Sequence, residues 1–252
     1  MYVENALFNY CLWLGDSSLI LGHRLSEWTG HGPILEEDIA MTNIGLDLVG
    51  QASSLLTLAG EIENKGRSDD DLAYKRDLKE FKNALLVEQV NGDFGRTMMR
   101  QYLFDVFHFH LMEGLSDSKD ERLGAIASKS LKEIKYHKRH SGEWIKRLGD
   151  GTEESHERTQ NALNELWMFT DDLFVAYAED KELEDKGIVP DLNQIKGKWE
   201  KGVKGLLKEA TLAIPEEVFM MKGSRNGIHS EHLGYLLAEM QFLPRAYPDA
   251  KW

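Results

Sequence analysis

The chain has 252 residues, 42% of them hydrophobic and 10% aromatic, which is enough to build a core and excludes an intrinsically disordered protein. Thirty Lys and Arg against 43 Asp and Glu give a net charge of −13, and this acidic balance argues against binding to nucleic acid or to an anionic membrane surface. The length fits one large domain or two small ones.

The placement of proline predicts long helices. Prolines stand at 33, 190, 215, 244 and 248, so residues 34 to 189 contain none. Apolar residues recur there at three- and four-residue steps, as one face of a helix requires. We predict helices at 2–22, 35–62, 95–116, 118–148, 153–180, 190–211 and 230–243, with shorter helical pieces within 69–88. This pattern favours an all-α, up-and-down helical bundle, and no shift in composition divides residues 1–252 into two domains.

The single cysteine, Cys11, excludes an intrachain disulfide, a CxxC zinc site and an iron–sulfur cluster. It lies in the apolar run 6–14, so we interpret it as a packing residue rather than a nucleophile. No segment has the ~18 consecutive apolar residues of a membrane span, and the acidic N-terminus lacks the basic region of a signal peptide. We therefore expect a cytoplasmic protein.

Short catalytic motifs are absent from the chain, which has no Walker A loop, no GxGxxG after a strand, no GxSxG and no HExxH. The remaining candidate chemistry is a metal site between helices. A di-iron centre needs about four carboxylates and two imidazoles, and two of its helices carry Glu-x-x-His. The spacing of three places both side chains on one helix face, so it can be searched for directly.

Glu153 and His156 form the one literal Glu-x-x-His of the sequence. They follow Thr152 at the predicted start of a helix, where a hydroxyl cap and carboxylates in the first turn are favourable. Capping and exposure to solvent explain this pair better than metal binding does.

The predicted helix 95–116 carries two further pairs with ligand spacing. Asp105 and His108 are offset by five residues from His110 and Glu113, which rotates the second pair by about 140°. The two pairs therefore cannot both face one centre.

Two other polar groupings lie on the helices predicted at 118–148 and 35–62. His137 and His140 have cationic neighbours that oppose a bound metal ion, and we expect at least one of them on the solvent face. Asn43, Asp47 and Gln51 form a polar row at four-residue steps. A buried row of this kind is either a structural hydrogen-bond network or part of a polar site inside the bundle, because unpaired buried polar groups cost ~1–3 kcal/mol each.

Several runs, in order over nearly the whole chain, carry a family resemblance: residues 27–28, 44–52, 86–89, 91–92, 100–102, 132–133, 136–137, 229–234 and 237–241. In these runs the sequence resembles the PaaC family, the C subunit of bacterial phenylacetyl-CoA 1,2-epoxidase. The resemblance implies a ferritin-like helical bundle, similar to the catalytic A subunit of the same enzyme, which holds a di-iron centre.

The resemblance also locates the positions that hold iron ligands in the catalytic A subunit. They correspond here to Ser18, Leu48, Gln51, Asp105, Ile134 and His137. Of these six, Asp105 and His137 retain a ligand type. A register shifted by one residue would pair Glu133 with Tyr136 and restore one Glu, but Leu48 and Gln51 would remain.

The four replaced positions argue against a metal centre. Leucine and isoleucine offer no lone pair, and the Gln51 amide and Ser18 hydroxyl are neutral. Two iron ions carry at least four positive charges, and burying them without compensating carboxylates costs several kcal/mol per ion. We expect no di-iron centre, no other cofactor and no catalytic residue in this chain, and a buried hydrogen-bonded network of Asp105, His137 and Gln51.

We interpret the chain as a non-catalytic structural subunit that pairs with the di-iron A subunit and supports epoxidation of phenylacetyl-CoA. Residues 219–222 and 241–244 are apolar enough to dock a partner, and a homodimer of the isolated chain is left open. Two alternatives remain. One is an active di-iron oxygenase or iron binder that uses Asp105, His137, Glu133 and Asp47. The other is a CoA-ester-binding adaptor with no obligate oxygenase partner.

Overall fold

The computed structural model describes residues 2–248 and 250, and within them it contains helices and connecting segments but no strand. Ten α-helices are present among these residues, confirming the all-α prediction. Their bounds are α1 Tyr2–Ser26, α2 Leu35–Glu63, α3 Asp69–Tyr74, α4 Phe94–Leu115, α5 Glu121–Gly149, α6 Glu153–Leu166, α7 Ala178–Asp185, α8 Leu192–Glu209, α9 Glu231–Met240 and α10 Phe242–Ala246. Short 3₁₀ turns η1 (Leu78–Glu80), η2 (Trp167–Phe169), η3 (Asp171–Phe174) and η4 (Ser224–Asn226) connect some of them.

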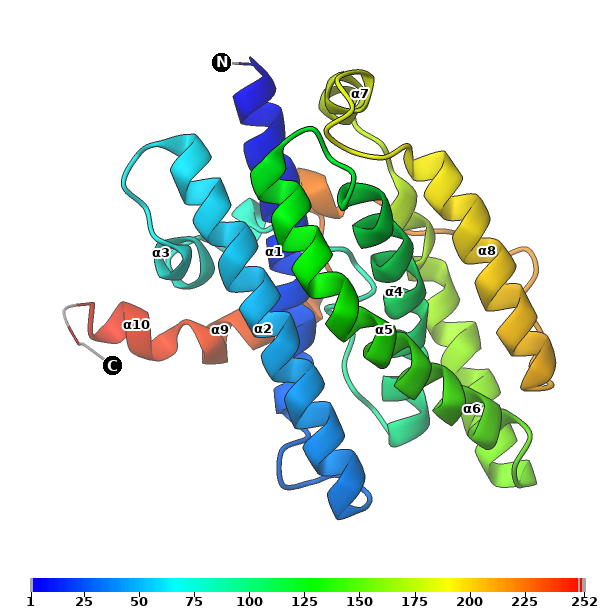
Figure 1. Cartoon of the computed structure of the whole chain (residues 1–252). Coiled ribbons are helices and arrows are strands. Elements are labelled where there is room, and N and C mark those ends of the chain that lie inside the picture. The colour runs from blue at the N-terminus through cyan, green and yellow to red at the C-terminus, as the bar shows by residue number, and fades with distance from the viewer. Residues whose placement is uncertain (1, 249, 251–252) are drawn as a thin grey trace.

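Four long helices form the bundle (Figure 1). α1 packs along α2, and α4 packs along α5, each pair being antiparallel and joined by a short loop. The long segment 64–93, which includes α3 and η1, links the two pairs, while α6 and α8 pack against α4. Two antiparallel helix pairs with one long crossover are the ferritin-like arrangement, as predicted.

Local sequence signals explain where these helices begin. Asp93, Asp120, Thr152 and Asp191 are N-cap residues whose side-chain oxygens accept hydrogen bonds from backbone N–H groups of the first turn. These caps satisfy donors that the helix itself leaves unpaired. The prediction that Thr152 caps a helix is confirmed.

The predicted helix at 153–180 is wrong in its second half. α6 ends at Leu166, and the chain continues as 3₁₀ turns, although no proline or glycine marks the break. The buried Asp172 carboxylate supplies the physical reason, because it accepts hydrogen bonds from the backbone N–H groups of Leu85 (3.0 Å), Gly223 (2.8 Å) and Ser224 (3.3 Å). These contacts with distant segments outweigh local helix propensity.

Glycines let the helices approach closely at two crossings. A Cβ atom built on Gly22 of α1 would lie 3.1 Å from the Gly45 carbonyl oxygen of α2. A Cβ atom on Gly149, the last residue of α5, would overlap the carbonyl oxygen of Ala210 after α8. Glycine at both positions therefore sets the distance between neighbouring elements.

We expect Gly149→Ala to lower the free energy of unfolding by about 1–3 kcal/mol, because the backbone after α8 must move to admit the methyl group. Gly205→Ala is the matched control, since a Cβ atom there meets open space within α8 and alanine favours a helix by ~1 kcal/mol. Urea unfolding of both variants checks this. Equal stability of Gly149→Ala and the parent chain would contradict the proposed close approach.

A buried ion pair attaches the C-terminal part of the chain to the bundle. The Arg225 guanidinium donates to both carboxylate oxygens of Asp180, at 2.6 and 2.7 Å. Its central carbon lies 4.8 Å from the Trp13 ring centroid and 4.5 Å from that of Tyr177. Arg225 and Asp180 are both buried, so each charge depends on the other for compensation.

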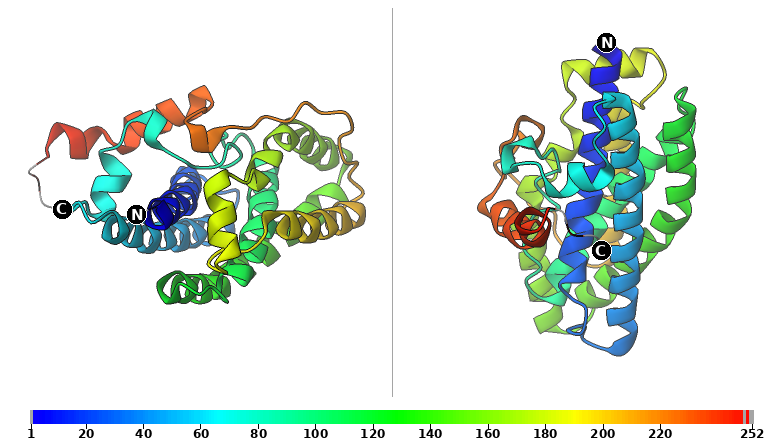
Figure 2. Two further views of the ribbon diagram at one scale, coloured as in Figure 1. Left: turned by 90° about the horizontal axis from the view of Figure 1, so that it is seen from above. Right: turned by 90° about the vertical axis from the view of Figure 1, so that its left-hand side faces the viewer.

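The buried Glu88 carboxylate fixes the residues that precede α9. It accepts hydrogen bonds from His229 Nδ1 (2.9 Å), from the Ser230 backbone N–H (2.6 Å) and from the Asn83 side chain (3.0 Å). From this anchor α9 and α10 extend sideways past the bundle (Figure 2).

Candidate functional site

The six positions implied by the resemblance lie on all four bundle helices. Ser18 is on α1, Leu48 and Gln51 are on α2, Asp105 is on α4, and Ile134 and His137 are on α5. All six side chains are buried, with relative exposures of 0–3%. Gln51, Asp105 and His137 each contact polar side chains outside this set of six, and no hydrogen bond joins two of the six to each other among the described contacts.

Two parallel contacts join α2 to α5. His137 Nε2 lies 2.9 Å from Asp47 Oδ2, and Gln51 Nε2 donates to Glu133 Oε2 at 2.8 Å. On each helix the two partners are four residues apart, so both contacts lie on one face. The polar row of α2 thus serves as a hydrogen-bond network between helices. Its first member, Asn43, is exposed.

A third contact joins α4 to α5. Asp105 accepts hydrogen bonds from the side chains of Gln101 and Ser141, each at 2.7 Å. Burial raises the pKa of Asp105 to about 6, while the charge of His137 and the two hydrogen bonds oppose this rise. The prediction that Asp105 is buried and hydrogen-bonded is confirmed. The predicted shared network is wrong in its partners, because His137 pairs with Asp47 and Gln51 with Glu133.

The remaining positions provide little for a metal ion to bind. Leu48 and Ile134 are fully buried hydrocarbon, and the Ser18 hydroxyl has no hydrogen-bond partner in the described part of the chain. No group of three or more His, Cys, Asp or Glu side chains within residues 2–248 and 250 is placed to hold a metal ion. This donor set does not fit two iron ions, which need about four carboxylates.

The other candidate pairs of α4 lie in different surroundings, as their rotation predicts. His108 is buried, and burial lowers its pKa to about 3, with the positive charge of His137 acting in the same direction. His110 and Glu113 are half-buried and lie 3.4 Å apart. His108 is therefore neutral near pH 7, and the two pairs share no centre.

The expectation that His137 or His140 faces solvent is wrong. His137 is fully buried, and the side chain of His140 is 10% exposed. Glu37 covers His140, because its carboxylate accepts hydrogen bonds from His140 Nε2 (2.7 Å) and Trp144 Nε1 (2.9 Å). The Glu37 carboxylate, in the first turn of α2, thus provides a hydrogen-bond partner for the His140 ring, which the sequence alone predicted to face solvent.

The predictions for two other candidates agree with the structure. Glu153 is exposed, and the ring of His156 bonds to the Gly149 carbonyl oxygen at 2.6 Å, so this pair belongs to the start of α6. Cys11 is fully buried, and burial raises the pKa of its thiol to about 12, which suits packing and not nucleophilic attack.

Gln101 and Ser141 are the residues of this network that sequence reasoning missed. Gln101 precedes Asp105 by four residues, and Ser141 follows His137 by four. A polar pair at this spacing on an otherwise apolar helix is a signal that could have identified both.

The Asp105 carboxyl predicts a pH dependence of stability. Because its pKa is about 6 in the folded chain and 3.8 ordinarily, the folded state binds more protons between these values. Stability contributed by this group is present below about pH 4 and is lost as pH rises through about 6, by up to ~3 kcal/mol. Urea unfolding at several pH values from 4 to 7 measures this. The difference in free energy of unfolding between the parent chain and Asp105→Asn should change by this amount over that range. A constant difference would contradict the assignment.

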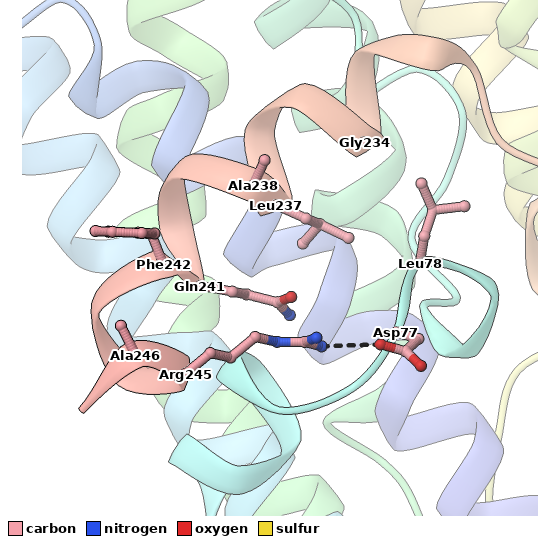
Figure 3. A pocket seen from close by; sticks show the side chains of 9 residues that line it. All are labelled: Asp77, Leu78, Gly234, Leu237, Ala238, Gln241, Phe242, Arg245 and Ala246. Atoms are coloured by element: carbon pink, nitrogen blue, oxygen red, sulfur yellow. Dashed lines mark hydrogen bonds and ion pairs between the residues drawn. The ribbon is translucent and has the colours of Figure 1, made fainter. Parts of the chain in front are cut away.

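Two surface pockets lie beside α9 and α10, away from the six positions. One has a volume of about 560 Å³, and Figure 3 shows Leu78 and Leu237 on its sides, with Arg245 bonded to Asp77 at 3.1 Å. The other, of about 620 Å³, lies against α3 and includes Tyr74. Neither pocket contains any of the six positions.

The two runs predicted to dock a partner are partly exposed. Phe219 is 77% exposed, Phe242 is 65% exposed and Leu243 is 48% exposed, whereas Gln241 is buried against the end of α3. Docking by these residues stays a prediction. Among the helices of the described residues, none is both long and apolar enough to cross a membrane.

Comparisons with known proteins show the family of this chain. A family model described as phenylacetic acid catabolic protein, covering PaaA and PaaC, matches residues 2–252. The chain is 46% identical over 248 residues to the C subunit of 1,2-phenylacetyl-CoA epoxidase from Escherichia coli strain K12, and the matched region covers 98% of this chain and 100% of that protein. The chain belongs to the phenylacetic acid catabolic protein family, as its sequence runs indicated.

Proposed function

We propose that this chain is a non-catalytic structural subunit of a phenylacetyl-CoA 1,2-epoxidase and that it pairs with the di-iron A subunit. Its family membership supports a role in phenylacetate catabolism, and its relative in Escherichia coli is named as a subunit of this enzyme. In this proposal the iron and the oxygen chemistry belong to the partner.

The buried hydrocarbon of Leu48 and Ile134 is the observation that carries the proposal. Two iron ions bring at least four positive charges, and Asp105 is the one carboxylate among the six positions. Its raised pKa shows that the surroundings disfavour even a single negative charge. Burying two cations against leucine and isoleucine would cost several kcal/mol per ion.

The polar pairs of the bundle suit a structural role. Asp47 with His137 and Gln51 with Glu133 join the two helix pairs directly, at 2.9 and 2.8 Å. In a di-iron protein the metal ions themselves cross-link the helices. Here direct side-chain contacts join the helices, so a partner would meet a rigid surface without requiring iron in this chain.

Co-expression with a di-iron A subunit of this enzyme tests the proposal. We expect the two chains to elute as one complex, and we expect oxygen-dependent epoxidation of phenylacetyl-CoA to require the A subunit. An A-subunit variant that lacks its iron ligands is the control, since it should still bind but should abolish the activity.

The other outcomes identify the alternatives. Separate elution of the two folded chains would favour an adaptor that binds CoA esters without an oxygenase partner. Epoxidation by this chain alone would favour an active oxygenase. Either result would overturn the structural proposal.

A further inference from the structure

A pocket of about 370 Å³ lies between η2, α8 and the segment 213–222 that follows α8. Trp167 and Trp199 line it, with ring centroids 5.7 Å apart. Four apolar residues of the segment line it as well: Ile214, Pro215, Val218 and Met220. The volume is within the range of small-molecule sites, and none of the six positions inside the bundle contributes to the lining.

The two tryptophans of this pocket are held differently. Trp199 is 3% exposed and donates its indole N–H to the Leu103 carbonyl oxygen at 2.8 Å, so its ring is fixed. Trp167 is half-buried, and among the described residues no acceptor bonds to its indole N–H. A flat ring in the pocket would therefore meet an aromatic side chain whose donor is unpaired. Stacking on aromatic side chains is a common way in which proteins bind nucleotide bases.

The segment 213–222 covers the pocket and is attached at its two ends. The Gln160 side chain exchanges two hydrogen bonds with the Ala213 backbone, both at 2.8 Å, and the Met221 N–H donates to the Met168 carbonyl oxygen at 2.8 Å. Between these attachments, residues 214–220 form no backbone hydrogen bond with other described residues. This orange segment lies at the edge of the molecule beside α6 and α8 (Figure 2). It can move outward to admit a ligand without breaking secondary structure.

Three lysines of α8 form a row beside the pocket. Lys204 lines the pocket, and Lys201 and Lys208 lie three residues before it and four after it, on the same side of the helix. Among the described residues no carboxylate pairs with Lys201 or Lys208. Lys204 forms an exposed pair with Glu200 at 3.4 Å, and exposed pairs contribute little free energy. All three ammonium groups are therefore available to an anion.

The charge of α8 contrasts with that of the whole chain. α8 carries five lysines and two glutamates, whereas the chain has a net charge of −13. Most of the surface therefore repels a polyanion, and locally basic faces such as α8 attract it. Of the carboxylates at the pocket, Asp171 is compensated by Lys196 at 2.8 Å and Lys222 at 3.1 Å. Glu217 is exposed, has no cationic partner among the described residues, and opposes a bound anion.

We infer that this pocket binds a nucleotide with more than one phosphate group, the base lying against Trp167 and the phosphates on Lys201, Lys204 and Lys208. An aromatic side chain alone would suit any flat ring, and a single carboxylate would leave two of the three lysines unused. A nucleotide has both the ring and several negative charges. Two sources share this chemistry, namely the nucleotide tail of a CoA ester and a free nucleotide. Assignment to a CoA ester rests on the proposed function, whereas the nucleotide site itself does not.

Titration of the isolated full chain, followed by calorimetry and tryptophan fluorescence, tests the site. We expect CoA and the bisphosphorylated adenosine that forms its tail to bind with dissociation constants within about threefold of each other. Pantetheine, the part of CoA without the nucleotide, should not bind. Binding of CoA about tenfold tighter than ADP would support a site for CoA esters, and the reverse order would support a site for free nucleotides. Binding of pantetheine as tightly as CoA, or of no nucleotide at millimolar concentration, would overturn the inference.

Variants test the aromatic side and the lysine row separately. Trp167→Leu should weaken CoA binding by about tenfold or more, and Trp167→Phe should restore most of the affinity, because a ring remains for stacking. Lys204→Gln combined with Lys208→Gln should weaken binding by about tenfold and should reduce its dependence on salt. Lys129→Gln, at an exposed position of α5, is the matched control and should change the affinity by less than about twofold. Unchanged affinity in the tryptophan and lysine variants would overturn the inference.

Glu217→Gln gives a result that misfolding cannot imitate. Removing this carboxylate should strengthen CoA binding by about two- to fivefold, since it takes a negative charge away from the pocket. Weaker binding by this variant would contradict the placement of the phosphates.

The nucleotide site and the proposed function fail in different experiments. Absence of nucleotide binding to the isolated chain would overturn the site and leave the structural role standing. Separate elution of this chain and the A subunit would overturn the structural role and leave the site standing.

Discussion

Replacing Leu48 with glutamate is expected to lower the free energy of unfolding by more than about 3 kcal/mol and to create no iron site. Leu48 is fully buried on α2 and belongs to the hydrophobic core. The variant removes that apolar contact and places a carboxylate where no cation compensates it. Burial would keep this carboxyl protonated at neutral pH, and a neutral acid is a poor iron ligand.

Urea unfolding with and without ferrous iron measures both parts of this prediction. Leu48→Met is the control, because it conserves volume and should cost less than ~1.5 kcal/mol. The destabilisation by glutamate should shrink as pH falls below its ordinary pKa range, since both states then hold the proton. A stable Leu48→Glu variant that gains stability from iron would show that the centre still accepts a metal.

Replacing Arg225 with alanine is expected to lower the free energy of unfolding by about 3–5 kcal/mol, because it leaves the buried Asp180 carboxylate without its charge partner. The lost guanidinium also packs between the Trp13 and Tyr177 rings, so its removal exposes part of the core on α1. Since Arg225 lies before α9, the C-terminal segment should become sensitive to proteolysis before the bundle unfolds.

Two comparisons separate the buried pair from surface charge effects. The double variant Arg225→Ala with Asp180→Asn should recover part of the loss, since it removes the uncompensated charge. Arg245→Ala breaks an exposed pair with Asp77 and should cost less than about 1 kcal/mol. Equal losses for Arg225→Ala and Arg245→Ala, measured by urea unfolding, would contradict the role assigned to the buried pair.

The sequence predicted the elements whose causes are local. Absence of proline and a three-to-four spacing of apolar residues located α2 and α4 within one residue at each end. The end of α6 could not be predicted, because its cause is Asp172, which contacts residues 85, 223 and 224 far along the chain. Contacts between distant segments leave no periodic trace in the sequence.

In the candidate site, too, some features could be predicted from the sequence and others depend on contacts between distant segments. Burial of Asp105, Leu48 and Ile134 was implied by the family resemblance, which places them at ligand positions inside a bundle. The partners of His137 and Gln51 were not implied, because the relative register of α2 and α5 decides whether each meets Asp47, Glu133 or Asp105. A shift of one helical turn, about 5.4 Å, exchanges one partner for another, and no single-helix pattern fixes it.

The central claim is that hydrocarbon and neutral groups replace iron ligands in this bundle, and iron analysis of the isolated chain tests it most directly. The chain should be purified alone, loaded anaerobically with ferrous iron and freed of unbound metal, followed by elemental analysis and Mössbauer spectroscopy. We predict no stoichiometric iron and no spectrum of a coupled iron pair. About two iron atoms per chain, with such a spectrum, would contradict the account.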